Sequence, residues 1–201
     1  MIKISLKTLS IGLFLGAHSI ALAVPVTFDF TGSPNNTGDP LTYSEGGIDL
    51  TINGYPDPAV AVDLNLGLGV NFTQIPADSE QIDGAGRTET LEMEFSPNVQ
   101  LLSVTFGNVQ QNDGFTLSVD GTEFFNGDIP GLGQPFINTS SSNLIGSTFT
   151  FGVTENNDDY FIRNITVQAI ATPESGTTLV LAGLGILGLT ILRACSVKHL
   201  F

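Results

Sequence analysis

Apolar and polar residues alternate with a period of two along most of the chain between residues 26 and 169. Successive side chains of a β-strand point to opposite faces of a sheet, so this period is typical of half-buried strands. No helical period is present before residue 177. We therefore expect strands at Val26–Phe30, Ile48–Ile52, Val60–Val70 (the longest alternation), Leu91–Phe95, Leu102–Phe106, Phe115–Val119, Phe149–Val153 and Ile165–Ala169.

Turn-forming residues separate these predicted strands. Asp120-Gly121 stands between one alternation and Thr122–Phe125, which predicts a β-hairpin with a two-residue turn. Eight or nine short strands with frequent turns predict an all-β fold, an antiparallel two-sheet sandwich of the jelly-roll kind. Further clusters of Gly, Pro, Asn and Asp occupy residues 33–40, 55–58, 76–86, 126–133 and 156–159.

The beginning of the chain has the order of a secretory signal peptide. Lys3 and Lys7 form a basic start, and Leu9–Leu15 form an apolar centre. Ala21 and Ala23 supply small residues at the two positions that signal peptidase reads, so we expect cleavage after Ala23. A retained membrane anchor is the competing interpretation, but the apolar centre is short for it. The predicted ectodomain then covers residues 24–170.

The end of the chain, residues 171–201, has the order of a membrane anchor. The sixteen residues Thr177–Leu192 carry no charge and are followed by Arg193 and Lys198. As a helix they would reach about 24 Å, against about 30 Å for the hydrocarbon core of a bilayer. A buried core helix is the alternative. Basic residues favour the cytoplasmic side, so the predicted transmembrane helix leaves the ectodomain outside.

A sorting motif precedes this apolar run. Pro173-Glu174-Ser175-Gly176, a Leu/Gly-rich stretch and basic residues resemble, over about thirty residues, the PEP-CTERM class of bacterial sorting signals, closest to its VPDSG-like variants. The resemblance implies export and processing by an exosortase, a membrane-embedded cysteine transpeptidase of bacteria that make exopolysaccharide. The tail departs from the pattern in two respects, since Ser175 stands where a second proline is usual and the basic end is thin.

Two motifs of the body are also similar to those of exported PEP-CTERM proteins. They are residues 81–84 leading to 89–91, and residues 158–161 leading to 164–167. The similarity implies a jelly roll whose last strand runs into the sorting motif, and it implies no activity.

Charge and missing residue types restrict the function of the ectodomain. Residues 24–172 contain nineteen acidic residues against two arginines, a formal charge of −17. Such a field repels nucleic acid and attracts cations, so we expect no nucleic-acid partner. The same span has no His, Cys, Lys or Trp. Nucleophilic pairs with His, lysine Schiff bases and ordinary zinc sites are thereby excluded. Calcium ligation and carboxylate-based glycoside hydrolysis remain.

The calcium candidates are acidic residues in or beside turns, where carboxylates and free carbonyl groups can converge on a hard cation. The alternative is that these side chains bind the backbone of their own turns. No EF-hand loop is present in the sequence. The candidate calcium ligands are Asp83, Glu89, Asp113, Asp158 and Asp159.

The candidates for carbohydrate chemistry are a carboxylate pair and three tyrosines. Glu92 and Glu94 point to one face of a strand about 6.6–6.8 Å apart, near the separation found in inverting glycosidases. A solvated strand face is the alternative. In the absence of tryptophan, glycan contacts are expected from Tyr43, Tyr55 and Tyr160.

The sequence thus favours an exported, non-enzymatic protein with a structural, adhesive or glycan-binding role. It would be anchored transiently in the membrane and then held at the cell surface or in an extracellular polysaccharide matrix. Its partners would be an exosortase-type enzyme, the membrane and polysaccharide. The alternatives are a secreted carbohydrate-active enzyme and a calcium-dependent binding module.

Overall fold

The computed structural model describes an all-β protein. The described residues contain no helix, and so none that is long and apolar enough to cross a membrane. The predicted helix 177–192, the sorting motif at Pro173–Gly176, and Ala21 lie outside the described residues. The described residues are 23–31, 36–56, 59–64, 66–72, 79–131, 135–137 and 144–170.

Antiparallel pairing joins the strands of this part of the chain. The strands are β1 (Val26–Asp29), β2 (Asn36–Gly38), β3 (Leu41–Glu45), β4 (Ile48–Tyr55), β5 (Ala59–Leu64), β6 (Gly67–Phe72), β7 (Ile82–Asp83), β8 (Thr90–Gly107), β9 (Gly114–Val119), β10 (Thr122–Asp128), β11 (Pro135–Ile137), β12 (Ile145–Val153) and β13 (Asp159–Ala169).

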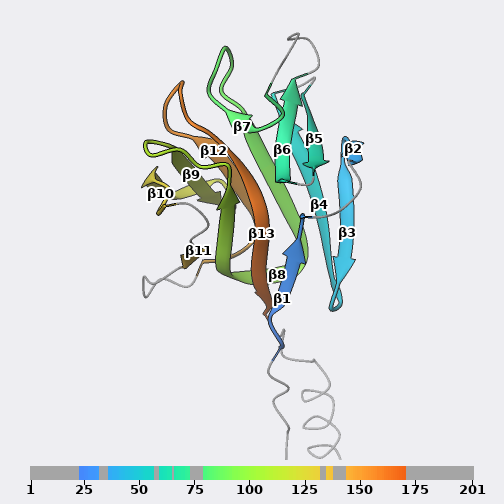
Figure 1. Cartoon of the computed structure of the whole chain (residues 1–201). Helices are drawn as coiled ribbons and strands as arrows, with labels where there is room; N and C mark the ends of the chain where they lie inside the picture. The colour runs from blue at the N-terminus through green and yellow to red at the C-terminus, as the bar shows by residue number, and fades with distance from the viewer. Residues whose placement is uncertain are drawn as a thin grey trace, which may run out of the picture.

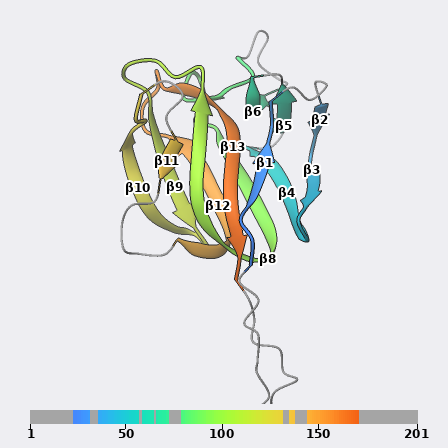
Figure 2. The same cartoon turned by 60° about the horizontal axis from the view of Figure 1, so that its bottom comes forward.

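The 18-residue strand β8 organises the sheet because its two halves have different neighbours. Its first half pairs with β4 on one side and β12 on the other, and this set continues through β3 at one edge and β9 and β10 at the other. Its second half pairs with β13 and β11. Strand β13 in turn pairs with β1, β6 and β7 (Figures 1 and 2).

Aromatic side chains join these two sets of strands across the core, which makes the fold sandwich-like. Phe28 of β1 contacts Phe95 in the first half of β8, with ring centroids 6.0 Å apart. Phe106 in the second half of β8 contacts Phe115 of β9 at 4.7 Å. All four rings are at most 5% exposed. Burying each ring stabilises the fold by roughly 1.5–3 kcal/mol.

Several sequence predictions are confirmed. The alternating apolar residues of Ile48–Ile52, Leu91–Phe95, Phe115–Val119 and Phe149–Val153 are buried. The hairpin at Asp120-Gly121 is also confirmed. The two residues have φ angles of 48° and 79°, and Thr122 pairs with Val119 directly after them. Positive φ at both positions is the geometry that suits the right-handed twist of a hairpin.

The prediction of one strand over Val60–Val70 is wrong. The segment is a hairpin of β5 and β6, in which Leu64 pairs with Gly67. Gly67 has φ 131°, and a Cβ atom there would lie 2.6 Å from the carbonyl oxygen of Ile162. The turn therefore depends on a glycine that the regular apolar alternation conceals.

The separation of Leu91–Phe95 from Leu102–Phe106 is also wrong, because both belong to β8. A bulge between β8 and β13 shifts the register at Leu102, so Ser103 pairs with Thr166 while Leu101 pairs with Val167. Leu101 is consequently 1% exposed, whereas Leu102 is only partly buried. A bulge reverses which residues face the core.

The sequence prediction missed the short strands β2, β3, β7 and β11. Strand β3 forms a hairpin with β4 through Gly46-Gly47, whose φ angles are 57° and 79°. The other three have only two or three residues. Strands of that length contain too few residues to display a period.

The two ends of the described domain differ. Val26 of β1 pairs with Val167 of β13, so the start of the described domain lies beside its end. We call this end, made by 23–26 and 167–170, the tail pole. The opposite end is the loop pole, made by loops 108–113 and 154–158 and by segment 79–89, which contains β7. Figure 1 shows the start of β1 and the end of β13 together at the bottom, with the β12–β13 loop at the top.

Candidate functional site

All five predicted calcium ligands lie in one hydrogen-bonded network at the loop pole. Asp83 and Asp159 are opposite each other in the β7–β13 pair. The N–H of Gly84 donates to the Asp158 carbonyl over 3.2 Å, and the N–H of Asp159 is directed at the Asp113 carboxyl. We call Asp83, Glu89, Asp113, Asp158 and Asp159 the acidic network. Four of its members are at most 5% exposed, and Asp159 is half-buried.

Asp83 and Glu89 stabilise the loop that leads into β8. Asp83 accepts hydrogen bonds from the Ser79 hydroxyl at 2.5 Å and from the N–H of Ala85 at 3.0 Å. Its own N–H donates to Glu89 Oε2 at 3.3 Å, and the Glu89 N–H donates to the Asp83 carbonyl at 2.9 Å. This is the turn-capping role that the sequence left open as the alternative.

Asp158 closes the loop between β12 and β13. Its Oδ2 accepts hydrogen bonds from the Thr154 N–H at 3.0 Å, the Thr154 hydroxyl at 2.6 Å and the Glu155 N–H at 2.7 Å. Its Oδ1 is buried and has no hydrogen-bond partner. Leaving a buried polar atom unpaired costs about 1–3 kcal/mol, and more where the group is charged.

Asp113 closes the loop between β8 and β9. Its Oδ2 accepts a hydrogen bond from the Gln110 N–H. Burial raises the pKa of the Asp113 carboxyl, and the charges of Asp159 and Asp158 add to the rise, while the N–H groups of Gln110 and Asp159 oppose it. Its Oδ1, like that of Asp158, is buried without a partner.

Two glutamines connect the loops through Asp159. Gln81 Nε2 donates to Asp159 Oδ1 at 3.0 Å, and Gln110 Nε2 donates to Oδ1 and Oδ2 at 3.1 and 3.2 Å. No motif in the sequence predicts a role for Gln110. The only local sign of its role is its position in a loop, three residues before Asp113, which suits a turn hydrogen bond between the two.

The five candidate calcium ligands do not converge as side chains on one point within the described residues. Among the described residues, no group of three or more His, Cys, Asp or Glu side chains is arranged to hold a metal ion. The reason is that Asp83 and Glu89 direct carboxylate oxygens to the backbone of their own loop. Only Asp113 and Asp158 retain unpaired buried oxygens within the network.

The three tyrosines do not form a glycan platform. Tyr160 is 0% exposed and its hydroxyl donates to the Gly152 carbonyl at 2.8 Å, so the prediction that it contacts a glycan is wrong. Tyr43 is half-buried and its ring meets Phe30 edge-on, 5.3 Å away. Tyr55 is 42% exposed and is the one of the three that presents a large surface to solvent.

Glu92 and Glu94 lie on the outer face of β8, as the alternation predicts. Glu92 is half-buried and Glu94 is exposed. The Tyr55 hydroxyl donates to Glu92 Oε1 at 3.3 Å, and the negative charge of Glu92 raises the pKa of Tyr55. Neither glutamate lines the hollow beside residues 23–26 or the two hollows beside β3. Their surroundings are those of a solvated strand face.

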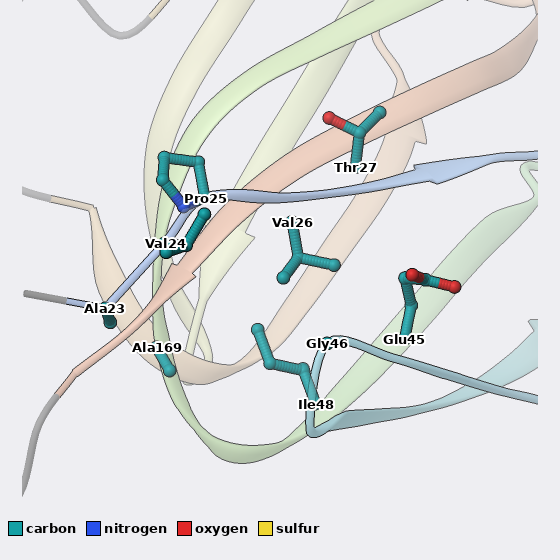
Figure 3. A pocket seen from close by; sticks show the side chains of 9 residues that line it. All are labelled: Ala23, Val24, Pro25, Val26, Thr27, Glu45, Gly46, Ile48 and Ala169. Carbon is teal, nitrogen blue, oxygen red and sulfur yellow. The ribbon is translucent and has the colours of Figure 1, made fainter.

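A hollow of about 490 Å³ lies at the tail pole (Figure 3). Polar and apolar atoms contribute equally to its wall, in which Val26 and Ile48 face each other and Glu45 lies at one side. It is remote from the acidic network, since it lies where the chain enters β1. Beside it, Gln168 Nε2 donates to the Ala23 carbonyl at 2.6 Å.

The chain matches no protein-family model, no curated protein and no solved structure.

Proposed function

We propose that this chain is an exported bacterial surface protein of the PEP-CTERM kind, whose β-domain is displayed in an extracellular polysaccharide matrix. Its role there is structural or adhesive. An exosortase-type enzyme removes the tail after a transient stay in the membrane. The finer description of the domain as a two-sheet jelly roll belongs to the same proposal, and the cross-core contacts of Phe28 with Phe95 and of Phe106 with Phe115 support it.

The pairing of β1 with β13 is the observation that carries this function. Because Val26 lies opposite Val167, the predicted signal peptide and the predicted anchor both join the domain at the tail pole. A domain held by its tail pole presents the loop pole to its surroundings. The last strand leads within a few residues to Pro173, so little chain separates the folded domain from the sorting motif.

Cleavage after Ala23 is compatible with the fold. It leaves Val24 and Pro25 ahead of β1, and both are exposed. The hydrogen bond from Gln168 to the Ala23 carbonyl would be lost. The four register pairs of β1 with β13 would remain. The strand that closes the core therefore survives processing.

A non-catalytic role accords with the surroundings of Glu92 and Glu94. Substrate-cleaving carboxylates ordinarily lie in a concave site that excludes water, and these two lie on an open strand face. We expect the purified protein to release no reducing sugar from the host polysaccharide. Release that disappears in E92Q or E94Q would establish the enzymatic alternative instead.

The test of the surface function is the intact mass and location of the protein in an exopolysaccharide-forming bacterium that has an exosortase. We expect surface-bound protein that begins at Val24 and has lost the residues beyond the motif. Replacing Pro173 and Glu174 together by Ala should leave uncut protein in the membrane fraction.

The matched control is Thr178→Ala, which changes a residue just beyond the motif and should be processed normally. Uncleaved protein in the cytoplasm would refute the export of the chain. Equal processing of the motif variant and the control would refute the sorting role of Pro173–Gly176.

A further inference from the structure

We propose that Asp113 and Asp158 together bind one calcium ion at the loop pole, with carbonyl oxygens of their loops and water completing its shell. The observation is a pair of carboxylate oxygens, Oδ1 of each residue, that are buried and have no hydrogen-bond partner. Both side chains are 1% exposed. The proposed site does not depend on export, because it belongs to the fold of the domain.

The two carboxylates are held by neighbouring loops that contact each other. The N–H of Asp159 is directed at the Asp113 carboxyl, and Asp158 is the residue before it. The backbone N–H of Gln110 donates to Asp113 Oδ2. Gln110, from the loop of Asp113, binds the Asp159 carboxylate. These contacts hold the loop of Asp113 against the loop of Asp158.

The hydrogen bonds of Asp113 and Asp158 satisfy only one of the two oxygens of each carboxylate. All three donors around Asp158 reach Oδ2, and the Gln110 N–H likewise reaches Oδ2 of Asp113. Oδ1 of each residue is therefore left without a donor. Two buried carboxylates of like charge repel each other, and burial weakens the screening by water. A cation bound to the two Oδ1 atoms would give each of them a partner and would offset the repulsion between the two carboxylates.

The chemistry of the ligands selects a hard cation. The span 24–172 contains no His or Cys, so the ligand set consists of oxygen atoms. Calcium accepts six to eight oxygens in irregular geometry, whereas magnesium requires a near-ideal octahedron. Irregular loops suit calcium. With only two carboxylates in the shell, we expect a Kd of about 10⁻⁴–10⁻³ M, the range of extracellular calcium modules.

The first test is calcium binding by the full-length chain in mild detergent, after removal of divalent ions by a chelator. Calorimetric titration with CaCl2 should show one ion per chain, and calcium should raise the melting temperature. Magnesium at the same concentration should raise it less. An unchanged melting temperature on adding calcium would overturn the site, and a response to magnesium alone would overturn the identity of the ion.

Variants locate the ion. We expect D113N and D158N to raise the Kd for calcium at least about 10-fold, the loss that removal of even a supporting group causes at a metal site. The control is D49N, the same change at an exposed residue of β4, which should bind as the natural chain does. Equal binding by D113N, D158N and D49N would refute the assignment.

The amide oxygen of D158N accepts less strongly than a carboxylate, so this variant weakens three hydrogen bonds and could unfold its loop. A second readout therefore uses the natural chain. The chain has no tryptophan, and Tyr160 follows Asp158 by two residues with its ring buried. Terbium, a calcium mimic, should emit on tyrosine excitation, and calcium should displace it. The emission should be lost in Y160F and retained in Y55F. Retention in Y160F would place the ion elsewhere.

Discussion

At the scale of single residues, burial and hydrogen bonding decide what a polar group in this domain can do. Asp83 and Glu89 have acidic side chains like Asp113, yet their carboxylates hold the backbone of their own loop. Asp113 and Asp158 also bind their own loops through Oδ2, but each keeps its buried Oδ1 without a partner. The sequence places all of them in turns, but it does not tell which oxygens the backbone occupies. That distinction depends on contacts between loops that are far apart in the sequence.

The tyrosines provide a prediction at the same scale. The charge of Glu92 raises the pKa of Tyr55, and burial raises that of Tyr160 much further. The folded pKa of Tyr55 exceeds its unfolded value of about 10. The contribution of the protonated Tyr55 to the stability of the fold is therefore complete below pH ~10 and is lost as pH rises through the folded pKa. In an alkaline titration followed by phenolate absorbance, E92Q should lower the pKa of Tyr55, and Tyr160 should ionise only on unfolding.

The assignment in that titration comes from Tyr55→Phe, which should remove the affected transition. The control is Glu123→Gln, the same change on an exposed residue of β10, and it should leave the titration as it is. A Tyr55 transition at the same pH in E92Q and in the natural chain would contradict the coupling.

At the scale of elements, the alternation predicts a strand well where both neighbours are regular and poorly where a bulge or a turn interrupts it. Phe115, Leu117 and Val119 are buried as predicted. The bulge at Leu102 moves the core face to Leu101, and Gly67 turns an apparent single strand into two. Both departures arise from contacts with β13, which is distant in sequence. Local periodicity contains no information about such contacts.

The β9–β10 hairpin provides a prediction at this scale. Asp120 Oδ1 accepts hydrogen bonds from the Thr148 N–H at 2.9 Å, the Ser147 N–H at 3.1 Å and the Ser147 hydroxyl at 3.3 Å, which fastens the hairpin to β12. Its φ of 48° disfavours most residues except Asn and Gly. Asp120→Ala should therefore lower the free energy of unfolding by about 1–3 kcal/mol, measured by denaturant titration.

Asp120→Asn is the matched variant, because asparagine tolerates the same φ and keeps an oxygen that can accept. It should lower stability less than Asp120→Ala does. Equal losses in the two variants would mean that the negative charge, rather than the backbone conformation and the acceptor, determines the effect.

At the scale of the whole molecule, closure of the core depends on a strand next to the predicted cleavage site. Strand β1 pairs with β13 over four residues and brings Phe28, 4% exposed, against Phe95. Without β1, this side of β13 would lose its partner between Asn164 and Val167, and an unpaired strand edge favours aggregation. The folded unit must therefore begin before Val26, however the preceding residues are processed.

Truncated chains test this requirement. A chain of residues 24–170 should unfold cooperatively in a circular-dichroism melt, because it keeps every described pair of strands. A chain of residues 30–170 should not fold, since it loses β1 and the burial of Phe28. Phe28→Ala in the longer chain should lie between them, losing about 3–5 kcal/mol while keeping the backbone pairing. If 30–170 melted at the same temperature as 24–170, β1 would be an accessory strand. The pairing of β1 with β13 would then no longer support the proposal that the domain is displayed from its tail pole.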